Sequence, residues 1–205
     1  MIFSPLGDVG YLAFFERELD GTVPPAEGAS EITVRWALPA EIDRIITGYD
    51  GSRSSEALSE RFRREDRCIA AFDGTGQIAH CRWVATRRAD IPECAMDLVL
   101  APGEAYFYDG YTRREARGRG IDAAVRSFIF HRLRADGFDR VYSSVRGDNP
   151  IGMKAARRRQ RLVQTLWYIR PHGLPALVIG RRALGRSRFV SAGTTQGATA
   201  AGIRG

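Results

Sequence analysis

Apolar and polar residues recur with two different periods along the first half of the chain. Short alternating or continuous apolar runs, typical of β-strands, lie at residues 31–36, 67–72 and 77–86. Between them, residues 39–48 and 54–65 repeat apolar side chains every three or four positions, as the buried face of a helix does. This order predicts one strand, two helices and then an antiparallel hairpin, with its turn at residues 73–76.

The second half shows one long helical pattern between two strands. Residues 105–112 are apolar and aromatic and predict a strand, and Ile121, Val125 and Ile129 begin a helix that Gly137 ends. A strand at 140–145 follows, so the unit predicts a parallel, right-handed crossover. Other strands are expected at residues 95–100, 162–169 and 176–179, a loop at 87–92, and a further helix from Pro150 to about Gln160.

The two ends of the chain differ from this pattern. Leu12, Phe15 and Leu19 have helical spacing, so residues 1–30 are expected to form a helical extension and a linker. That helix would pack on the surface of the domain, or act as a dimer arm or as a lid over an acyl site. Residues 31–184 are expected to form the main domain. Residues 185–205 are rich in Ser, Gly, Ala and Thr and are expected to form a disordered tail.

Composition favours one globular domain and an anionic partner. The chain has 205 residues, 44% of them hydrophobic, and a formal net charge of +7. All of its basic residues except Lys154 are arginine, a bias that genomic base composition also produces, so nucleic acid is not predicted. The cluster at residues 157–161 would suit the 3′-phosphate of CoA, an acidic carrier protein or RNA, or would simply be a solvated helix end. No aromatic residues are interleaved with it for stacking on bases.

Cysteine and histidine usage argues against disulfides and metal sites. Cys68, Cys81 and Cys94 are odd in number and well separated, which predicts buried free thiols and a reducing cytoplasm. There is no C-x-x-C and the histidines are scattered, so a structural zinc site has little support. No apolar run has the length of a membrane span and no signal peptide is apparent, so we expect a cytoplasmic protein.

The junction between the central strand and helix has the sequence Arg-Gly-Arg-Gly-Ile-Asp at residues 117–122. The first N–H groups of a helix lack intrahelical partners and carry partial positive charge. Glycines allow a ligand to approach the backbone, and Arg117 and Arg119 add fixed charge. The junction therefore predicts a phosphate or pyrophosphate site, with a plain tight turn as the alternative. The spacing is neither that of a P-loop nor that of a Rossmann fold.

This junction resembles the acyl-CoA pyrophosphate loop of the GNAT acetyltransferases, whose pattern is Gln/Arg-x-x-Gly-x-Gly/Ala. Arg117 and Gly120 match, whereas Asp122 stands where the last Gly or Ala belongs. A carboxylate there suits the helix dipole but would repel a phosphate that it faced. The resemblance extends over roughly residues 31–170. It implies an α/β (α+β) fold with a mixed, mostly antiparallel twisted sheet of about seven strands flanked by helices.

The resemblance also implies acetyl-CoA or another acyl-CoA as cofactor. The residues that would bind it are Tyr111, Thr112, Arg117, Gly118, Arg119, Gly120, Ile121, Asp122 and Asn149. Asn149 matches an Asn that the family often has before a short helix, although an Asn before Pro150 also suits a structural turn. The tyrosine that usually donates a proton to the CoA thiolate falls on Ala156.

An amine must be neutral to attack a thioester, which costs a lysine-like amine roughly 4–5 kcal/mol at pH 7. Asp109 is the leading candidate for the general base, because partial burial among tyrosines would raise its pKa; pairing with an arginine is the alternative. Tyr108 and Tyr111 are candidates for the acid. An N–H near Tyr111 or Thr112 would polarise the thioester, where the family's central strand parts from its neighbour. The weaker base candidates are Glu104, Asp97 and His80.

Three functions are compatible with these residues. The first is N-acetyl transfer to a small amine, amino acid or amino sugar. The second is transfer of longer acyl groups from CoA or an acyl-carrier protein. The third is non-catalytic binding of CoA or an anionic polymer. The first is the main prediction, with a small-molecule amine as partner, a homodimer as a further option, and no nucleic acid or membrane.

Overall fold

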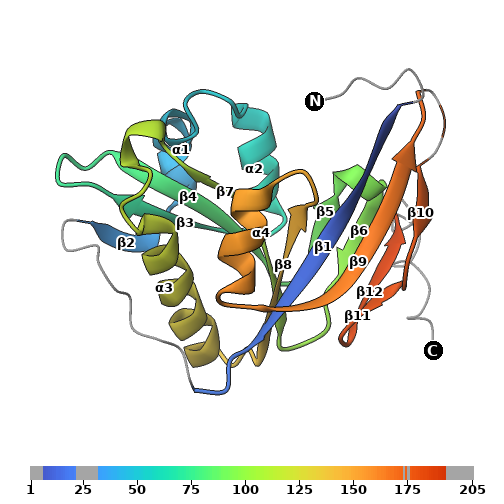
Figure 1. Ribbon diagram of the computed structural model, residues 1–205. Coiled ribbons are helices and arrows are strands. Elements are labelled where there is room, and N and C mark those ends of the chain that lie inside the picture. Colours follow the sequence, from blue (N-terminus) through green and yellow to red (C-terminus); the bar gives the residue numbers. More distant parts are fainter. Residues whose placement is uncertain (1–6, 22–31, 173, 175, 193–205) are drawn as a thin grey trace, which may run out of the picture.

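The computed structural model describes residues 7–21, 32–172, 174 and 176–192. A large twisted sheet carries helices on both faces, and a smaller sheet packs against one end of it (Figure 1). The α-helices are α1 (Ile42–Gly48), α2 (Ser55–Arg63), α3 (Ile121–Ala135) and α4 (Pro150–Arg157). Short 3-10 helices are η1 (Pro39–Glu41), η2 (Pro92–Cys94) and η3 (Arg114–Ala116).

The large sheet has eight strands in the order β10-β9-β1-β8-β7-β4-β3-β2. All neighbours are antiparallel except β7 and β8, which are parallel and joined through α3. The mixed, mostly antiparallel sheet and the crossover are therefore confirmed. The strands are β1 (Asp8–Glu18), β2 (Thr33–Trp36), β3 (Arg67–Phe72), β4 (Ile78–Ala85), β7 (Glu104–Thr112), β8 (Arg140–Arg146), β9 (Arg161–Arg170) and β10 (Leu177–Ile179).

The two faces of the large sheet carry different helices. Val125 and Ile129 of α3 pack with Phe107 on one face, and Leu58 of α2 packs with Trp83 on the other face. Helix α4 lies on the α3 side, because Ala156 packs on the odd-numbered residues of β1. The smaller sheet, in the order β11-β12-β6-β5, covers the even-numbered residues of β1 on the side of α1 and α2. Its strands are β5 (Arg88–Ile91), β6 (Met96–Val99), β11 (Ala183–Leu184) and β12 (Ser187–Ser191).

The helix expected over residues 11–19 is wrong, because this segment is strand β1. It pairs antiparallel with β8 on one side and β9 on the other. Four consecutive residues from Leu12 to Phe15 are buried, since helix α4 and the smaller sheet cover opposite faces. A strand that is buried on both faces lacks the alternation of apolar and polar residues that identifies most strands. The continuous apolar run in β1 therefore also fitted the spacing of a helix. The linker expected after residue 21 lies outside the described residues.

Two further expectations need correction. Residues 88–91 form strand β5 rather than a loop, paired with β6. The tail expected to be disordered contains β12, whose Phe189 packs edge-on against Phe14 with ring centroids 5.2 Å apart. Both strands are short and contain charged residues, so their apolar pattern is weak, and they are defined by pairing with β6 and, for β12, also with β11. Residues 193–205 lie outside the described part of the chain.

The remaining structural expectations concern thiols, metals and membranes. All three cysteines are free and buried, as predicted. Burial raises the pKa of the Cys81 thiol to about 12 and that of Cys94 to about 11, so neither is an activated nucleophile. Within the described residues, no group of three potential metal ligands comes together. Of the helices in that part of the chain, none is long and apolar enough to cross a membrane.

Candidate functional site

The parallel strands β7 and β8 part halfway along their length. Their pairing runs from Glu104 opposite Arg140 to Phe107 opposite Ser143. Beyond this point β7 continues beside β4 as far as Thr112, while β8 continues beside β1. The next β7 residues therefore have no ladder partner on the β8 side, which is the gap that the resemblance predicts.

A β-bulge bends β7 where the gap begins. The register between β4 and β7 shifts between Cys81 and Trp83, opposite Asp109. Asp109 has φ +45°, a left-handed conformation that non-glycine residues seldom adopt. The buried hydroxyl of Tyr49 donates to the Asp109 carbonyl at 2.6 Å and holds this conformation. Bulges of this kind redirect a strand and its side chains, here at the opening of the gap.

The glycine-rich loop lies on the α3 side of this gap. Gly118 has φ +76°, and Gly120, at the N-cap of α3, has φ +73°. A Cβ at Gly118 would meet no atom within 4 Å, so this part of the loop opens to solvent. Arg117 donates from Nε to the carbonyl of Thr112 at 3.1 Å, and its guanidinium lies 5.6 Å from the Tyr111 ring centroid. The loop thus offers first-turn helix amides and arginine charge together.

The carboxylate of Asp122 binds two arginines beneath the first turn of α3. Its Oδ1 accepts from Arg82 Nη2 at 2.6 Å, and its Oδ2 accepts from Arg126 Nε at 2.9 Å. Burial alone would raise the pKa of Asp122, but the charges of Arg82 and Arg126 outweigh it and hold this pKa far below its usual range. Two arginines around one carboxylate leave a net positive charge beneath the loop. This charge offsets the repulsion that Asp122 alone would exert on a phosphate.

The arginine that reaches Asp122 also explains a glycine in the central strand. A Cβ at Gly110 would lie 2.2 Å from Arg82 Nη2, so the guanidinium crosses β7 where there is no side chain. Behind it, Arg126 Nη1 donates to Gln160 Oε1 at 3.2 Å, and the hydroxyl of Ser143 donates to the same oxygen at 2.8 Å. Buried polar groups therefore line the α3 side of the gap.

His80 belongs to this buried network. Its Nδ1 lies 2.7 Å from Thr112 Oγ1, while its Nε2 is buried and has no hydrogen-bond partner among the described residues. Burial, and then the charge of Arg82, lower the pKa of His80 to about 3. The imidazole is therefore neutral at pH 7 and remains so well into the acid range.

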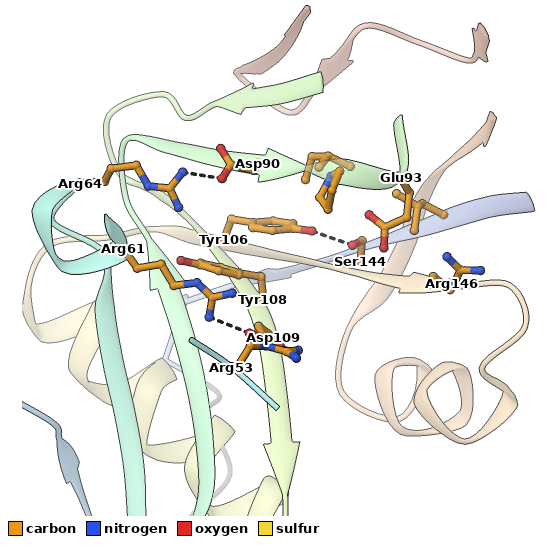
Figure 2. A pocket seen from close by; sticks show the side chains of 13 residues that line it. Arg53, Arg61, Arg64, Asp90, Glu93, Tyr106, Tyr108, Asp109, Ser144 and Arg146 are labelled. Carbon is orange, nitrogen blue, oxygen red and sulfur yellow. Dashed lines mark hydrogen bonds and ion pairs between the residues drawn. The ribbon is translucent and has the colours of Figure 1, made fainter. Parts of the chain in front are cut away.

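On the opposite face, a cavity of about 460 Å³ opens where β7 and β8 part (Figure 2). Tyr106 and Tyr108 of β7 form its floor, and their rings are stacked with centroids 6.3 Å apart. Arginines from α2 and its preceding loop form one wall, and residues of β5 and η2 form the other. The Tyr106 hydroxyl lies 2.6 Å from Ser144 Oγ, which joins β7 to β8 just beyond their last pair.

Asp109 lies in this cavity but is held by two arginines. Its carboxylate accepts from Arg53 Nη2 at 2.6 Å and from Arg61 Nη1 at 2.6 Å. Burial alone would raise the pKa of Asp109, but the hydrogen bond from Arg53 and the charge of Arg61 outweigh it and lower this pKa. A lowered pKa makes a weaker base, so the arginine pairing is observed and the catalytic role stays a prediction.

The two tyrosines predicted as acids donate to carboxylates. The Tyr108 hydroxyl donates to Asp66 Oδ2 at 2.6 Å, and the Tyr111 hydroxyl donates to Asp50 Oδ2 at 2.5 Å. Burial, followed by the neighbouring Asp66, raises the pKa of Tyr108 far above its usual range. Their catalytic roles stay predictions, and only Tyr108 lines the cavity.

The segment before α4 has a structural function. Asn149 is the N-cap of α4, and its Oδ1 accepts from the Gly152 amide at 2.9 Å. Ala156, at the position of the family's tyrosine, is buried against Ala13 and Phe15 of β1. Its side chain therefore supports the sheet rather than the gap. The predicted contact between Asn149 and the cofactor is untested, as are the other predicted cofactor contacts.

Several cavity residues were not predicted from the sequence. Glu93 lies just after a stretch expected to be a loop, and it points into the cavity on the side of Ser144 (Figure 2). Ser144 follows Ser143 between the apolar residues Tyr142 and Val145 of β8, and such a polar pair is a detectable signal. Arg61 is three residues after Leu58 on the buried side of α2. Of the other base candidates, buried Glu104 accepts from the Tyr142 hydroxyl at 3.0 Å and Asp97 pairs with Arg88, outside the cavity.

Comparisons by sequence alone found nothing: no family model and no curated protein matches the chain. Solved structures do match. A GCN5-related N-acetyltransferase from Sphaerobacter thermophilus has a TM-score of 0.60 and 19% identity, over 79% of this chain and 51% of its own. A tandem GNAT protein from the clavulanic acid biosynthesis pathway has a TM-score of 0.57 and 14% identity, over 79% and 53%.

A third match is a phosphinothricin acetyltransferase from Sinorhizobium meliloti in complex with AcCoA. Its TM-score is 0.53 and its identity 20%, over 78% of this chain and 86% of its own. This chain spans about half the length of the first two proteins, and its similarity to all three is one of fold. Together with strands β7 and β8 parting beside a glycine-rich loop, these matches show that the chain has the fold of the GNAT acetyltransferases.

Proposed function

We propose that this chain is an acyl-CoA-dependent N-acyltransferase that acetylates the amine of a small molecule. One observation supports this most directly: the strands β7 and β8 part between the glycine-rich loop on one face and the cavity of about 460 Å³ on the other. A thioester placed in the gap would be held from the loop side and attacked from the cavity side. This arrangement brings two reactants together at one point, which is the main requirement of group transfer.

The loop residues fit the phosphates of CoA. Gly118 and Gly120 have the positive φ values that expose backbone amides, and Arg117 is fixed beside them through Thr112. The carboxylate of Asp122, which would oppose a phosphate, is neutralised by Arg82 and Arg126. When bound, acyl-CoA would supply the activated acyl group as a thioester.

The chain itself must move one proton and stabilise one developing charge. A carboxylate in the cavity would accept the proton of the attacking amine, which relieves the roughly 4–5 kcal/mol cost of deprotonating it at pH 7. Backbone amides of β7 beyond Phe107 lack a partner on the β8 side and would polarise the thioester carbonyl. Asp109 contributes by holding Arg53 and Arg61 in place, and it is poorly suited to be the base itself.

A second candidate is a protein that binds CoA without catalysing transfer. The observation that favours it is Ala156, which replaces the family's usual proton donor and is buried beneath β1. Transfer of longer acyl groups, from CoA or from a carrier protein, remains a variant of the main proposal.

The test is transfer of an acetyl group to a pool of small amines, followed by thiol release and by mass spectrometry of the products. Acetylated amine that appears with the wild type and falls at least about tenfold in Arg117→Ala supports the proposal. Arg114→Ala is the matched control, because Arg114 is an exposed arginine of the same loop. Acetyl-CoA binding without any product would favour the second candidate, and absence of binding would refute both.

A further inference from the structure

The cavity beside the parted strands carries opposite charges at two ends (Figure 2). Arg53 and Arg61 lie at one end together with Asp109. Glu93, from η2, lies at the other end near Ser144. Because a ligand in the cavity would meet both ends, their charges indicate what kind of acceptor fits.

At the arginine end, Arg61 has N–H groups that are left over for a ligand. Arg53 and Arg61 share the single carboxylate of Asp109. The guanidinium of Arg61 lies 5.1 Å from the ring centroids of both Trp83 and Tyr108, which orients it. Arg61 gives one N–H to Asp109, and a guanidinium has five. The neighbouring Arg64 differs, because it pairs with two carboxylates, those of Asp66 and Asp90.

The acidic end is a carboxylate without a cation. Glu93 is partly buried, and no hydrogen bond or ion pair to its carboxylate is found among the described residues. Buried Ile91 and Cys94 on either side anchor the segment that carries it. The cavity arginine on the same side as Glu93 is Arg146 (Figure 2), which is bound by Asp148 through two hydrogen bonds of 3.1 Å and also pairs with Asp8. Glu93 is therefore available for an ammonium group.

The surface between the two ends is apolar and aromatic. Leu12, Ile91 and the stacked rings of Tyr106 and Tyr108 line it. A volume of about 460 Å³ is in the range of small-molecule sites. It would accept the carbon skeleton of a small metabolite between its two charged groups.

We infer that the acceptor is an amino acid in the broad sense, a small molecule whose amine lies against Glu93 and whose carboxylate lies against Arg61. This inference rests on the proposed function, and it adds the substrate class. In the reaction, the amine nitrogen forms the new bond to the acyl carbon while the bond from that carbon to sulfur breaks. Glu93 takes one proton from the bound ammonium group before the attack, directly or through water, and the thiolate of CoA leaves. The second proton, which the nitrogen loses as the amide forms, passes to this thiolate or to water.

Other small amines fit the charges less well. An amine without an acid group would leave the remaining N–H groups of Arg61 without an acceptor in a partly desolvated site. A phosphate, with two negative charges, would be opposed by Asp109, which lies on the same arginines. A carboxylate matches the N–H groups that Arg61 does not give to Asp109 and the forked geometry of its guanidinium.

The test compares matched acceptors with the full-length wild type. The panel consists of glycine, 4-aminobutyrate, 6-aminohexanoate, L-lysine and L-phenylalanine, each with its carboxamide, and kcat/KM is measured with acetyl-CoA. We expect at least one acid to exceed its carboxamide by about tenfold or more, the effect of one charged hydrogen bond. Equal use of acids and carboxamides, or no transfer to the panel, would overturn the inference. Calorimetry with acetyl-CoA and transfer to the wider pool of small amines separate this failure from failure of the proposed function, which predicts both binding and transfer.

Substitutions at Arg61 and Glu93 test which end of the cavity binds the carboxylate of the acceptor and which binds its amine. Arg61→Gln should raise KM about tenfold for the acid and leave the carboxamide unchanged, and Arg61→Lys should restore part of the preference if the charge matters. Arg63→Gln is the control on the same helix, since 70% of the Arg63 side chain is exposed. Glu93→Gln should lower kcat for acid and carboxamide alike, unlike the exposed control Glu56→Gln. Equal losses for acid and carboxamide in Arg61→Gln would overturn the assignment of the carboxylate.

Discussion

The carboxylate of Asp122 and the guanidinium of Arg82 form an ion pair, 2.6 Å between Oδ1 and Nη2, that joins α3 to β4 across the central strand. The pair accounts for two unusual residues at once. It gives a carboxylate a structural role at a position where the GNAT pattern has Gly or Ala, and it requires glycine at position 110, over which Arg82 passes. Asp122 is thus part of the ion-pair network beneath the loop, and its charge is compensated there rather than repelling a phosphate.

Replacing Asp122 should therefore destabilise the fold without improving CoA binding. Asp122→Ala leaves Arg82 and Arg126 without their shared partner, which we expect to cost roughly 2–4 kcal/mol of unfolding free energy, discounted because 32% of the Asp122 side chain is exposed. Urea unfolding measures the loss and calorimetry measures the CoA affinity. Asp43→Ala, an exposed acidic residue in the first turn of α1, is the control and should cost about 0.3–1 kcal/mol. Tighter CoA binding in Asp122→Ala would show that this carboxylate faces the phosphates.

His80 should make stability depend on pH. Its folded-state pKa of about 3 lies below its ordinary value of 6.5, so the unfolded chain binds a proton first as the pH falls. Stability is therefore lost below about pH 6.5, by roughly 2 kcal/mol between pH 7 and pH 5 at 1.36 kcal/mol per unit. The unfolding free energy of His80→Gln should change less over this interval, whereas the exposed control His131→Gln should follow the wild type. Parallel curves for His80→Gln and the wild type would contradict this assignment.

Asp109→Asn should lower turnover with little change in CoA affinity. The amide would no longer neutralise Arg53 and Arg61, so both guanidinium groups would shift in the cavity while the loop on the opposite face is untouched. We expect kcat/KM for the acceptor to fall about tenfold or more. Asp139→Asn is the control, because 59% of the Asp139 side chain is exposed and it pairs with an arginine outside the cavity, Arg186. Unchanged turnover in Asp109→Asn would remove this residue from the acceptor site.

Phe14 tests the placement of the N-terminal strand. Phe14 is fully buried between β1 and the smaller sheet, so Phe14→Ala should cost about 3–5 kcal/mol in urea unfolding. Val9→Ala, in the same strand but 57% exposed, should stay within about 0.5 kcal/mol of the wild type. In the surface helix expected from the sequence, Phe14 would face away from Leu12, Phe15 and Leu19 and its replacement would cost little. A small effect at Phe14 would therefore restore that expectation.

Local pattern predicted several elements at or near their observed positions. Strand β3 occupies the predicted residues 67–72, and Ser54 caps α2 through its side chain as expected. The glycine-rich junction also has its predicted place between β7 and α3. In each case the signal lies within a few neighbouring residues, so it can be read without knowledge of the rest of the fold.

The elements that were missed depend on distant partners. Strand β1 lies between β8 and β9, two strands that come more than 100 residues later, and nothing in residues 8–18 indicates them. The same is true of the site. Only when β4, β7 and α3 are side by side is it evident that Arg82 passes over Gly110 to reach Asp122. Glu93 of η2 and Ser144 of β8 likewise line one cavity although they are about 50 residues apart in the sequence.

The most direct test of the account is calorimetric titration of the wild type with acetyl-CoA at low and moderate salt, repeated with Gly120→Glu. Gly51→Glu is the control, since Gly51 has a similar φ of +71° but lies in the loop between α1 and α2. We predict saturable binding to the wild type and to Gly51→Glu that weakens with salt, and its loss in Gly120→Glu, which places a carboxylate in the anion site. No binding to the wild type, or equal binding to both variants, would contradict the assignment of the glycine-rich loop as a CoA site.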